Sequence, residues 1–511
     1  MSSPTLDPKE PPLLKSRLPV IGHIIGLIHH QASYHKLLSN KYSRVKCATL
    51  PMLNGKLYAI YDPYLCQQVL RNNIASFDPF QQEFAQKVFG LNQATYDKIR
   101  LQPSIFKDFT DAIHRSFQTE SLAKMNLLWL RDFTAKIGPI SAHDAVVDIE
   151  NCGRERIAED GAVEVENFFL WCRDVMTLAT TRALYGDHDP FIRDKTLIDA
   201  SWVYEEGIQY FLMAMFPSLT IRRSYKARQH LQQVMGKYYT AGHHTSDPTT
   251  ATVTFNRANT LADYGFTGEE IGLMECILPV VSTLNAVPTL YWLLLYLLPD
   301  PSLVEELREE IAACVETSWS DSAGGRVVTF NISKFDTELP LLVSCYRETL
   351  RLVNHTICNR RILQDMTIVD QDGRTYLLKQ GIDVQLPAGV THRETTTWGS
   401  DARNFRADRF LASTSKVTDA DRARKAAYMP FGGGRHLCPG RNFAFAEIIG
   451  CAAIMLLGFD IEAIGMKFEE MGMQGPRLSS GTVKPVSNGK RLGARIKPRE
   501  DFEYISWKFR A

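Results

Sequence analysis

The amino-acid sequence predicts a mainly α-helical fold with a small β portion. Three observations predict it: helical periodicity dominates the middle of the chain, a strong hairpin signal lies near the N-terminus, and a strand-like group follows residue 360. No internal repeat, charge block or low-complexity tract interrupts this pattern. We therefore expect a single domain over residues 1–511, which begins with a proline-rich segment at 1–40.

The first β element is expected around Asn54-Gly55. This dipeptide joins the β-rich runs Val45–Leu50 and Lys56–Tyr61, and such a dipeptide is a strong signal for a tight hairpin turn. A helical pattern follows at Pro63–Asn72.

The long middle of the chain is expected to be helical. Thr267 and Glu270 form a capping-box pattern that opens an apolar run, and Asp300-Pro301 marks the start of a helix over Ser302–Glu316. The glycine- and serine-rich stretch Ser318–Asn331 is expected to form a surface loop.

The last part of the chain is expected to combine strands with another core helix. A second strand group is predicted over Arg361–Val384, with a turn at Asp372-Gly373. Two stretches, Ile277–Leu298 and Phe443–Phe459, are apolar enough to mimic membrane spans, but each contains polar residues and lies between polar motifs. We interpret both as buried helices.

The charge balance argues against nucleic-acid binding. Lysine and arginine number 58 and aspartate and glutamate 57, so the net charge is +1 and no global field would attract a polyanion. The ten cysteines are scattered without a Cys-x-x-Cys pair, which is typical of a protein from a reducing compartment.

The most informative segment is Phe431–Arg441, which places Cys438 in a glycine-rich loop before the helical run Asn442–Leu457. Three consecutive glycines would let the backbone approach a flat ligand closely. A thiolate there would be stabilised by the positive N-terminus of the helix. The alternative is an inert, buried cysteine in an ordinary turn.

The segment Phe431-Gly432-Gly433-Gly434-Arg435-His436-Leu437-Cys438-Pro439-Gly440 resembles the haem-binding loop of the cytochrome P-450 superfamily, Phe-x-x-Gly-x-Arg-x-Cys-x-Gly. The resemblance implies haem b as cofactor and Cys438 as its axial iron ligand. A thiolate ligand favours cleavage of an O–O bond. The resemblance also implies that the cofactor is contacted by Phe431, Gly432, Arg435, His436 and Gly440.

Two further motifs extend the resemblance over nearly the whole chain. Tyr346–Arg351 contains the family's Glu-x-x-Arg, and Phe405–Phe410 occurs where the family places a third charged partner. The resemblance implies that Glu348, Arg351 and Arg409 form a structural triad. It also implies a triangular, helix-rich prism with the haem between the long central helix and the helix after the cysteine loop.

The sequence departs from the family around the expected haem carboxylates. His436 replaces the usual arginine two residues before the cysteine, which would turn a permanent ion pair into a hydrogen bond or a pH-dependent contact. At the start of the strand after Glu-x-x-Arg, Arg361 is favoured over Arg360 as a further carboxylate partner.

A second departure concerns the family's tryptophan followed four residues later by a basic residue. Trp129 is followed at that distance by Phe133, so Arg115 or Lys124 would have to replace the basic residue, although each is more often a solvated charge.

The largest departure lies in the central helix. Leu284 and Asn285 stand where the family usually has an acid and an alcohol that relay protons, a role that leucine cannot perform. Asn285 and Pro288 resemble the branch that contains cholesterol 7α-hydroxylase and prostacyclin synthase, so both residues 284 and 285 are assigned to the catalytic region. A buried asparagine needs a partner, and an oxygen ligand or water at the haem would provide one. The alternative is a polar group satisfied within the core.

Three functions follow from the resemblance. The leading one is a haem-thiolate monooxygenase that takes electrons from NADPH through an NADPH-cytochrome reductase and inserts one oxygen from O₂ into a small apolar substrate. The second is a haem-thiolate isomerase or dehydratase that needs no reductase. The third is a haem-binding protein without catalysis.

Substrate and location are indicated only coarsely. The apolar, methionine-rich segment Tyr210–Pro217 lies where the family's pocket roof is expected, which suits a lipid, a terpenoid or a steroid-like skeleton, although the alternative is that it forms the core of a helix. The loop Arg435–Arg441 resembles that of fungal members of the family, which implies a role in secondary metabolism. Its part Phe211–Phe216 could contact a membrane surface. The apolar stretch Val20–Ile28 is too short to span a bilayer, yet the resemblance implies the cytosolic face of the endoplasmic reticulum.

Overall fold

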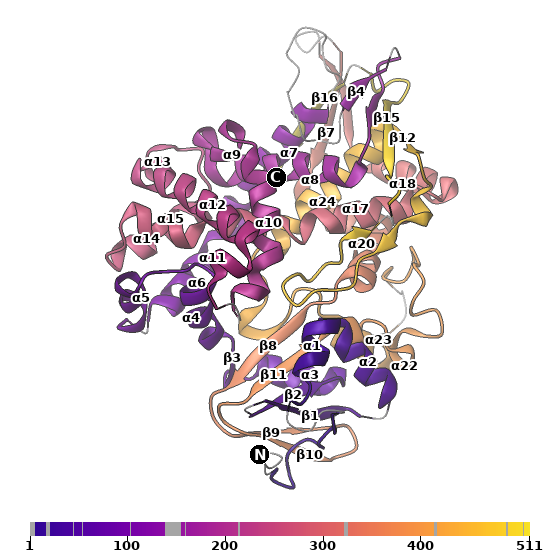
Figure 1. Cartoon of the computed structure of the whole chain (residues 1–511). Coiled ribbons are helices and arrows are strands. Elements are labelled where there is room, and N and C mark those ends of the chain that lie inside the picture. The colour runs from indigo at the N-terminus through magenta and orange to yellow at the C-terminus, as the bar shows by residue number, and fades with distance from the viewer. Residues whose placement is uncertain are drawn as a thin grey trace.

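The computed structural model describes residues 6–16, 21–43, 45–53, 55–102, 104–137, 155–158, 160–212, 215–320, 325–412, 416–486, 489–503 and 505–511. Helices dominate the described chain, and small sheets lie at its periphery (Figure 1). This matches the mainly α-helical fold with a small β portion that the sequence predicts. The most important sheet lies at one end of the molecule, near the N-terminus (Figure 1).

Fourteen α-helices of the described chain precede residue 264. They are α1 (Ile24–His30), α2 (Ser33–Lys41), α3 (Pro63–Arg71), α4 (Asp78–Lys87), α5 (Gln93–Arg100), α6 (Ile105–Ser116), α7 (Thr119–Ile137), α8 (Phe168–Tyr185), α9 (Pro190–Arg193), α10 (Thr196–Phe211), α11 (Pro217–Thr220), α12 (Arg222–Thr240), α13 (His243–Ser246) and α14 (Thr252–Asp263).

The helices of the C-terminal half include those that frame the site. They are α15 (Gly268–Glu275), α16 (Leu278–Thr283), α17 (Ala286–Leu297), α18 (Pro301–Cys314), α19 (Phe335–Glu338), α20 (Pro340–Val353), α21 (Ala388–Thr391), α22 (Thr395–Trp398), α23 (Asp419–Ala427) and α24 (Arg441–Gly458). The predicted capping box of Thr267 and Glu270 is present at α15, and Asp300 caps α18 as predicted.

The main sheet has five strands in the order β1-β2-β11-β8-β3. Its hairpin is confirmed, because β1 and β2 pair antiparallel with Met52 opposite Gly55; the predicted turn residue Asn54 lies outside the described residues. β11 runs parallel to β2 and antiparallel to β8, so it brings the strand group after residue 356 against the N-terminal hairpin. The strands are β1 (Cys47–Met52), β2 (Gly55–Ile60), β3 (Ala75–Ser76), β8 (Ile357–Ile362) and β11 (Asp383–Pro387).

The remaining strands form smaller sheets. The predicted turn at Asp372-Gly373 separates the two strands of an antiparallel hairpin. These strands are β9 (Met366–Val369) with β10 (Thr375–Leu378), β12 (Phe459–Ile464) with β15 (Gly493–Pro498), β5 (Val163–Val165) and β4 (Glu155–Ile157), and β13 (Gly472–Met473) with β14 (Pro485–Val486).

The prediction of a surface loop over Ser318–Asn331 is wrong. The segment contributes β6 (Glu316–Ser320) and β7 (Gly325–Asn331), which pair antiparallel, and β16 (Ile505–Arg510) adds to β7 in parallel. Most residues of β7 are buried, among them Val327, Val328 and Phe330. The glycine and serine content of the segment indicated a loop, whereas β6 and β7 form a local hairpin to which the distant strand β16 is added.

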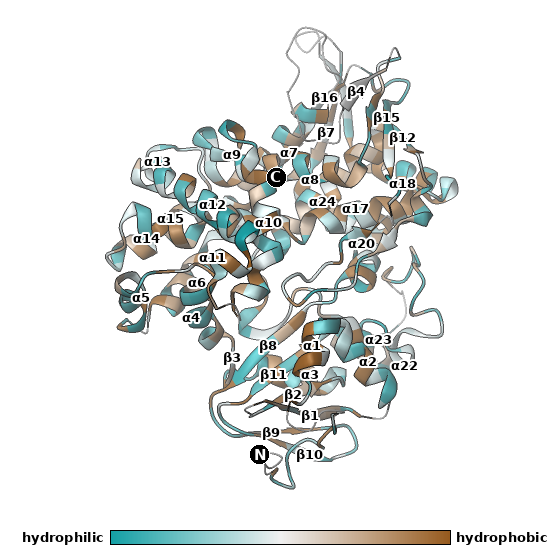
Figure 2. Cartoon of the chain, viewed as in Figure 1, coloured by the Kyte–Doolittle hydropathy of each residue, from teal (hydrophilic) through white to brown (hydrophobic). Residues whose placement is uncertain are grey.

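The central helical stretch is broken twice, between α15 and α16 and between α16 and α17. Pro279 and Pro288 lie just after the breaks, where each lacks the N–H that would bond to the carbonyl group four residues earlier. The helical stretches Gly268–Leu297 and Arg441–Gly458 are long and apolar enough to span a membrane by composition alone, but 72% and 78% of their most apolar windows are buried. The interpretation as core helices is confirmed, and Figure 2 shows both largely white to brown.

Candidate functional site

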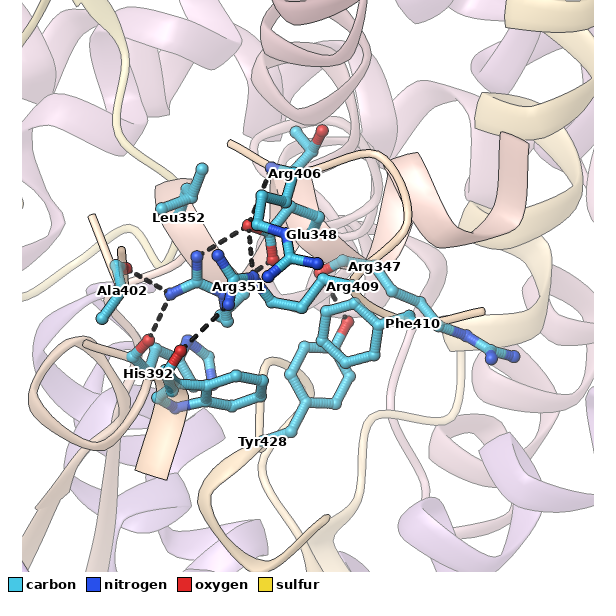
Figure 3. Close-up of polar contacts among 12 residues, drawn as sticks. Arg347, Glu348, Arg351, Leu352, His392, Ala402, Arg406, Arg409, Phe410 and Tyr428 are labelled. Atoms are coloured by element: carbon cyan, nitrogen blue, oxygen red, sulfur yellow. Dashed lines mark hydrogen bonds and ion pairs between the residues drawn. The ribbon is translucent and has the colours of Figure 1, made fainter. Parts of the chain in front are cut away.

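A buried ionic cluster fixes the end of α20 to the segment that follows α22 (Figure 3). Glu348 accepts hydrogen bonds from Nε and Nη2 of Arg351, both at 2.7 Å, and from Nε of Arg409 at 2.9 Å. The side chains of Glu348 and Arg351 are 0% exposed and that of Arg409 is 3% exposed. The structure therefore brings the three residues of the predicted triad together.

The second nitrogen arm of Arg351 binds main-chain carbonyl groups. Its Nη1 donates to the carbonyl oxygens of His392 at 2.8 Å and Ala402 at 2.6 Å, and its guanidinium lies 5.0 Å from the ring centroid of Trp398. The pair that could have been a solvated i,i+3 contact is instead a fully bonded link between three segments.

A cavity of about 450 Å³ lies between the broken helix α16–α17 and the loop before α24. Its wall is mostly apolar, and the helix contributes residues that recur every three or four positions, as one helix face does. These helix residues are Leu278, Val281, Ser282, Asn285, Ala286 and Thr289.

Cys438 lines this cavity at the N-terminus of α24, together with Phe431, Gly432, His436 and Gly440. Its backbone N–H donates to the carbonyl oxygen of Phe431 at 3.1 Å, which closes the loop. Burial raises the pKa of the Cys438 thiol, while backbone N–H groups of Gly440 and Arg441 lower it. A bound metal would overcome the effect of burial, because a coordinating thiol is deprotonated.

Glycine is required at the three loop positions for different physical reasons. This corrects the expectation that all three let the backbone approach a flat ligand. Gly434 has φ +63°, and a Cβ there would lie 1.7 Å from the carbonyl oxygen of Leu70 in α3. A Cβ on Gly433 would lie 2.9 Å from the Leu70 side chain. Only Gly432, with φ +74°, lines the cavity, so close packing on α3 requires the other two.

Arg360, not Arg361, lines the cavity, so the preference for Arg361 is reversed. Arg361 points the other way and forms ion pairs with Asp383 at 2.7 Å and Glu83 at 2.9 Å. Arg360 is 3% exposed, donates from Nη2 to the carbonyl oxygen of Gly433 at 3.1 Å, and has a buried Nε without a partner in the described structure. Strand alternation could have found it, because Arg360 shares the buried face of β8 with Cys358.

His436 lines the cavity as a neutral side chain. The backbone N–H of Phe77 donates to its Nε2 at 3.2 Å, so this nitrogen carries no proton and Nδ1 is the remaining donor. Burial and the nearby Arg360 lower the pKa of His436 to about 4. The contact to a carboxylate would thus be a hydrogen bond. Arg435 does not line the cavity and lies 3.6 Å from Asp78 at the surface, so its predicted contact with the cofactor stays a prediction.

Asn285 lies in the break between α16 and α17 and lines the cavity. Its Oδ1 accepts a hydrogen bond from the backbone N–H of Thr482 at 2.9 Å, so the protein itself supplies part of the partner that a haem ligand was expected to provide. Leu284 does not line the cavity and is buried in the core on the other side of the helix. Its assignment to the catalytic region is therefore corrected.

The segment Tyr210–Pro217 is not part of the cavity wall. Phe211 is buried against Tyr204, while Met215 and Phe216 are 75% and 70% exposed; Met213 and Ala214 lie outside the described residues. The described residues of the segment, 210–212 and 215–217, thus do not form the roof of this cavity.

The structure also places Trp129 and the two basic residues that were expected to replace the family's basic residue after the tryptophan. Trp129 is buried and donates from Nε1 to Oγ1 of Thr180 at 2.9 Å. Lys124 binds the carbonyl oxygen of Pro248, and neither Lys124 nor Arg115 lines the cavity.

Two cavity residues escaped the sequence reasoning. The Tyr346 hydroxyl and Oε1 of Glu447 are buried and have no partner in the described structure. Burial raises the pKa of Glu447 to about 8. The signal in the sequence for Glu447 was an acidic residue within the apolar helix α24, nine residues after Cys438.

The cavity's donor set fits an iron porphyrin with two carboxylates. Of its two thiols, that of Cys438 lies at a helix N-terminus and that of Cys358 in a strand; the walls for the macrocycle are apolar, and Arg360 supplies a cation and His436 an Nδ1 donor. The unpartnered Nε of Arg360 is an orphaned buried donor of the kind that a carboxylate satisfies.

The comparisons with known proteins agree with this geometry. The family model "Cytochrome P450" matches residues 197–485. The chain is 35% identical to a cytochrome P450 monooxygenase of Gibberella zeae over 99% of this chain and 92% of the relative. The chain belongs to the cytochrome P450 family.

Two further relatives cover nearly the full length of this P450. The cytochrome P450 monooxygenase nodJ of Hypoxylon pulicicidum is 27% identical over 99% of this chain and 93% of its own. The human 7-alpha-hydroxycholest-4-en-3-one 12-alpha-hydroxylase is 24% identical over 96% and 94%. The protein is therefore a cytochrome P450 monooxygenase, an oxidoreductase that uses haem.

Proposed function

We propose that this P450 inserts one oxygen atom from O₂ into a small apolar substrate, with electrons from NADPH delivered by an NADPH-cytochrome reductase. The observation that carries the proposal is that Cys438 and Asn285 line one mostly apolar cavity, one from the start of α24 and the other from the break in the central helix. The whole chain would act as one catalytic domain.

The residues divide into three roles in this proposal. Cys438 ligates the iron, and Arg360 and His436 hold the carboxylates. The triad of Glu348, Arg351 and Arg409 fixes α20 against the segment that follows α22, and its three residues do not line the cavity. Bound haem supplies the activation of O₂, and the thiolate ligand favours that chemistry.

Proton supply must differ from that of a chain with an acid and an alcohol in the helix. The amide of Asn285 is anchored through its oxygen to Thr482, which leaves its N–H₂ group to orient water in the cavity. The hydroxyl of Ser282, one turn earlier on the same face, also lines the cavity and can exchange protons with that water. We assign Asn285 to the orientation of water and Ser282 to the transfer of a proton.

The substrate class is proposed to be terpenoid or steroid-like, and the pathway fungal secondary metabolism. The cavity wall is largely apolar, which suits a hydrocarbon skeleton. Among the relatives, the human enzyme is named for a sterol, and two fungal relatives are named P450 monooxygenases.

We also propose attachment to the cytosolic face of the endoplasmic reticulum. Met215 and Phe216, just before α11, and Leu219 within it are 70–78% exposed and lie close together in the chain. Such an apolar patch on the surface is suited to contact with lipid.

The test is an incubation of the haem-loaded protein with reductase, NADPH and a panel of terpenoids and steroids. We expect a product that is heavier by one oxygen and that requires NADPH, and the label should come from ¹⁸O₂. Turnover of a peroxide or epoxide without NADPH would instead support the isomerase. A protein that binds haem but converts none of these substrate classes would contradict the proposal.

A further inference from the structure

A second cavity, of about 210 Å³, lies outside the haem site. It is enclosed by α2, α21 and the C-terminal segment at residues 473–476, which passes beside α1 and α2 (Figure 1). A hydrogen bond of 3.2 Å from the backbone N–H of Ala32 to the carbonyl oxygen of Pro476 fixes this segment against the helices.

Three basic side chains from three separate segments line this cavity: Lys36, His355 and Arg393. Arg393 donates from Nη2 to the carbonyl oxygen of Leu352 at 2.6 Å, whereas its Nε is buried without a partner in the described structure. The imidazole of His355 packs directly on Gly389, because a Cβ at that position would lie only 2.4 Å from its Nδ1.

No acidic side chain among the described residues pairs with Lys36 or Arg393. The pKa of Lys36 is lowered chiefly by burial and then by the like charges of Arg393 and Arg403. Burial and the charges of Arg393, His392 and Lys36 lower the pKa of His355. An enclosed cluster of like charges is costly, and the cost falls when an anion enters.

We propose that this cavity binds a compact oxyanion, a carboxylate or phosphate group, between Lys36 and Arg393. The planar fork of arginine offers directed donors to such an oxyanion, and lysine adds a mobile point charge. The volume admits the anionic group and a few further atoms but not a second large ligand.

The cavity is joined to the haem site through one loop. The backbone N–H of His355 donates to the carbonyl oxygen of Gly481 at 2.6 Å, and the next residue, Thr482, donates to Asn285. Val483 lines the anion cavity, and Thr482 lines the haem cavity. A bound anion would therefore hold the loop that positions Asn285.

The experiment uses the haem-loaded full chain and inorganic phosphate as the probe. Melting temperatures are measured in sodium phosphate and in sodium chloride of equal ionic strength, for wild type, Lys36→Gln and the control Lys41→Gln, which changes an exposed lysine of the same helix. We expect phosphate to raise the melting temperature of wild type and Lys41→Gln, and Lys36→Gln to weaken the apparent phosphate affinity about tenfold. In chloride, Lys36→Gln should be at least as stable as wild type, because repulsion is removed.

A second arm identifies the source of the anion. Sedimentation with phosphatidylcholine vesicles, with and without phosphatidic acid, shows a lipid source if Lys36→Gln loses binding to the acidic vesicles and Lys41→Gln does not. It shows a soluble source if vesicle binding is equal and only the phosphate effect is lost. If neither phosphate nor phosphatidic acid distinguishes Lys36→Gln from Lys41→Gln, the proposal is wrong. None of these readouts depends on turnover, so they remain separate from the test of the monooxygenase.

Discussion

Replacing Glu348 by alanine should lower the free energy of unfolding of this P450 more than removing an exposed ion pair of the same i,i+3 spacing does. Its carboxylate accepts from Arg351 twice, from Arg409 once and from the backbone N–H of Arg406 at 3.2 Å. In Glu348→Ala, the buried guanidinium of Arg351 loses its only carboxylate partner, and that of Arg409 loses the nearer of its two. We expect this to cost about 3–5 kcal/mol of the free energy of unfolding. That is a large share of the stability of an ordinary protein, about 5–15 kcal/mol.

The matched control is Glu305→Ala, which removes an i,i+3 pair with Arg308 that is 3.5 Å long and 59% exposed at the glutamate. It should cost less than about 1 kcal/mol. The assay compares denaturant midpoints and haem content of wild type and both variants. We expect low haem content and a much lower midpoint in Glu348→Ala alone. Equal midpoints in the two variants would refute the reasoning that burial, and not spacing, makes the triad important.

Four further outcomes are expected. Arg360→Gln should lower haem retention on dialysis while Arg361→Gln, outside the cavity, should not, and the reverse order would restore the original assignment. Asn285→Ala should lower product per NADPH and raise peroxide release, whereas unchanged coupling would remove it from the mechanism. Gly434→Ala should destabilise the fold, as seen by melting temperature, because its Cβ would meet a carbonyl oxygen of α3 and its φ is +63°. Glu447 has a folded-state pKa raised to about 8 from 4.5, so the folded state holds a proton that the unfolded state releases. Stability should fall as pH rises from about 4.5 to 8, and Glu447→Gln should flatten that fall in a series of melts.

Patterns local in the chain predicted the elements well. The hairpin at β1 and β2, the cap of α18 and the apolar helices α17 and α24 follow from turn residues, caps and periodicity, which act over a few residues. The hairpin of β6 and β7 is also local, and it was missed because the glycine and serine content of the segment indicated a loop. The parallel pairing of β7 with β16, a segment distant in sequence, has no local signal.

The sequence alone determined the chemistry that is available to this P450. Cys438 before an apolar helix, Glu348 three residues before Arg351, and Asn285 where an acid–alcohol pair is usual are all legible in the printed residues.

Only the tertiary structure decided which side chains share the haem cavity. Arg360 and Arg361 are neighbours of one residue type, and the pleat of β8 sends them to opposite faces, so one enters the cavity and the other pairs with Asp383. Asn285 bonds to Thr482, a residue almost two hundred positions away, and the loop glycine Gly434 is required by a helix that begins near residue 63. These contacts depend on packing between distant segments, and the spacing of residues along the chain does not contain that information.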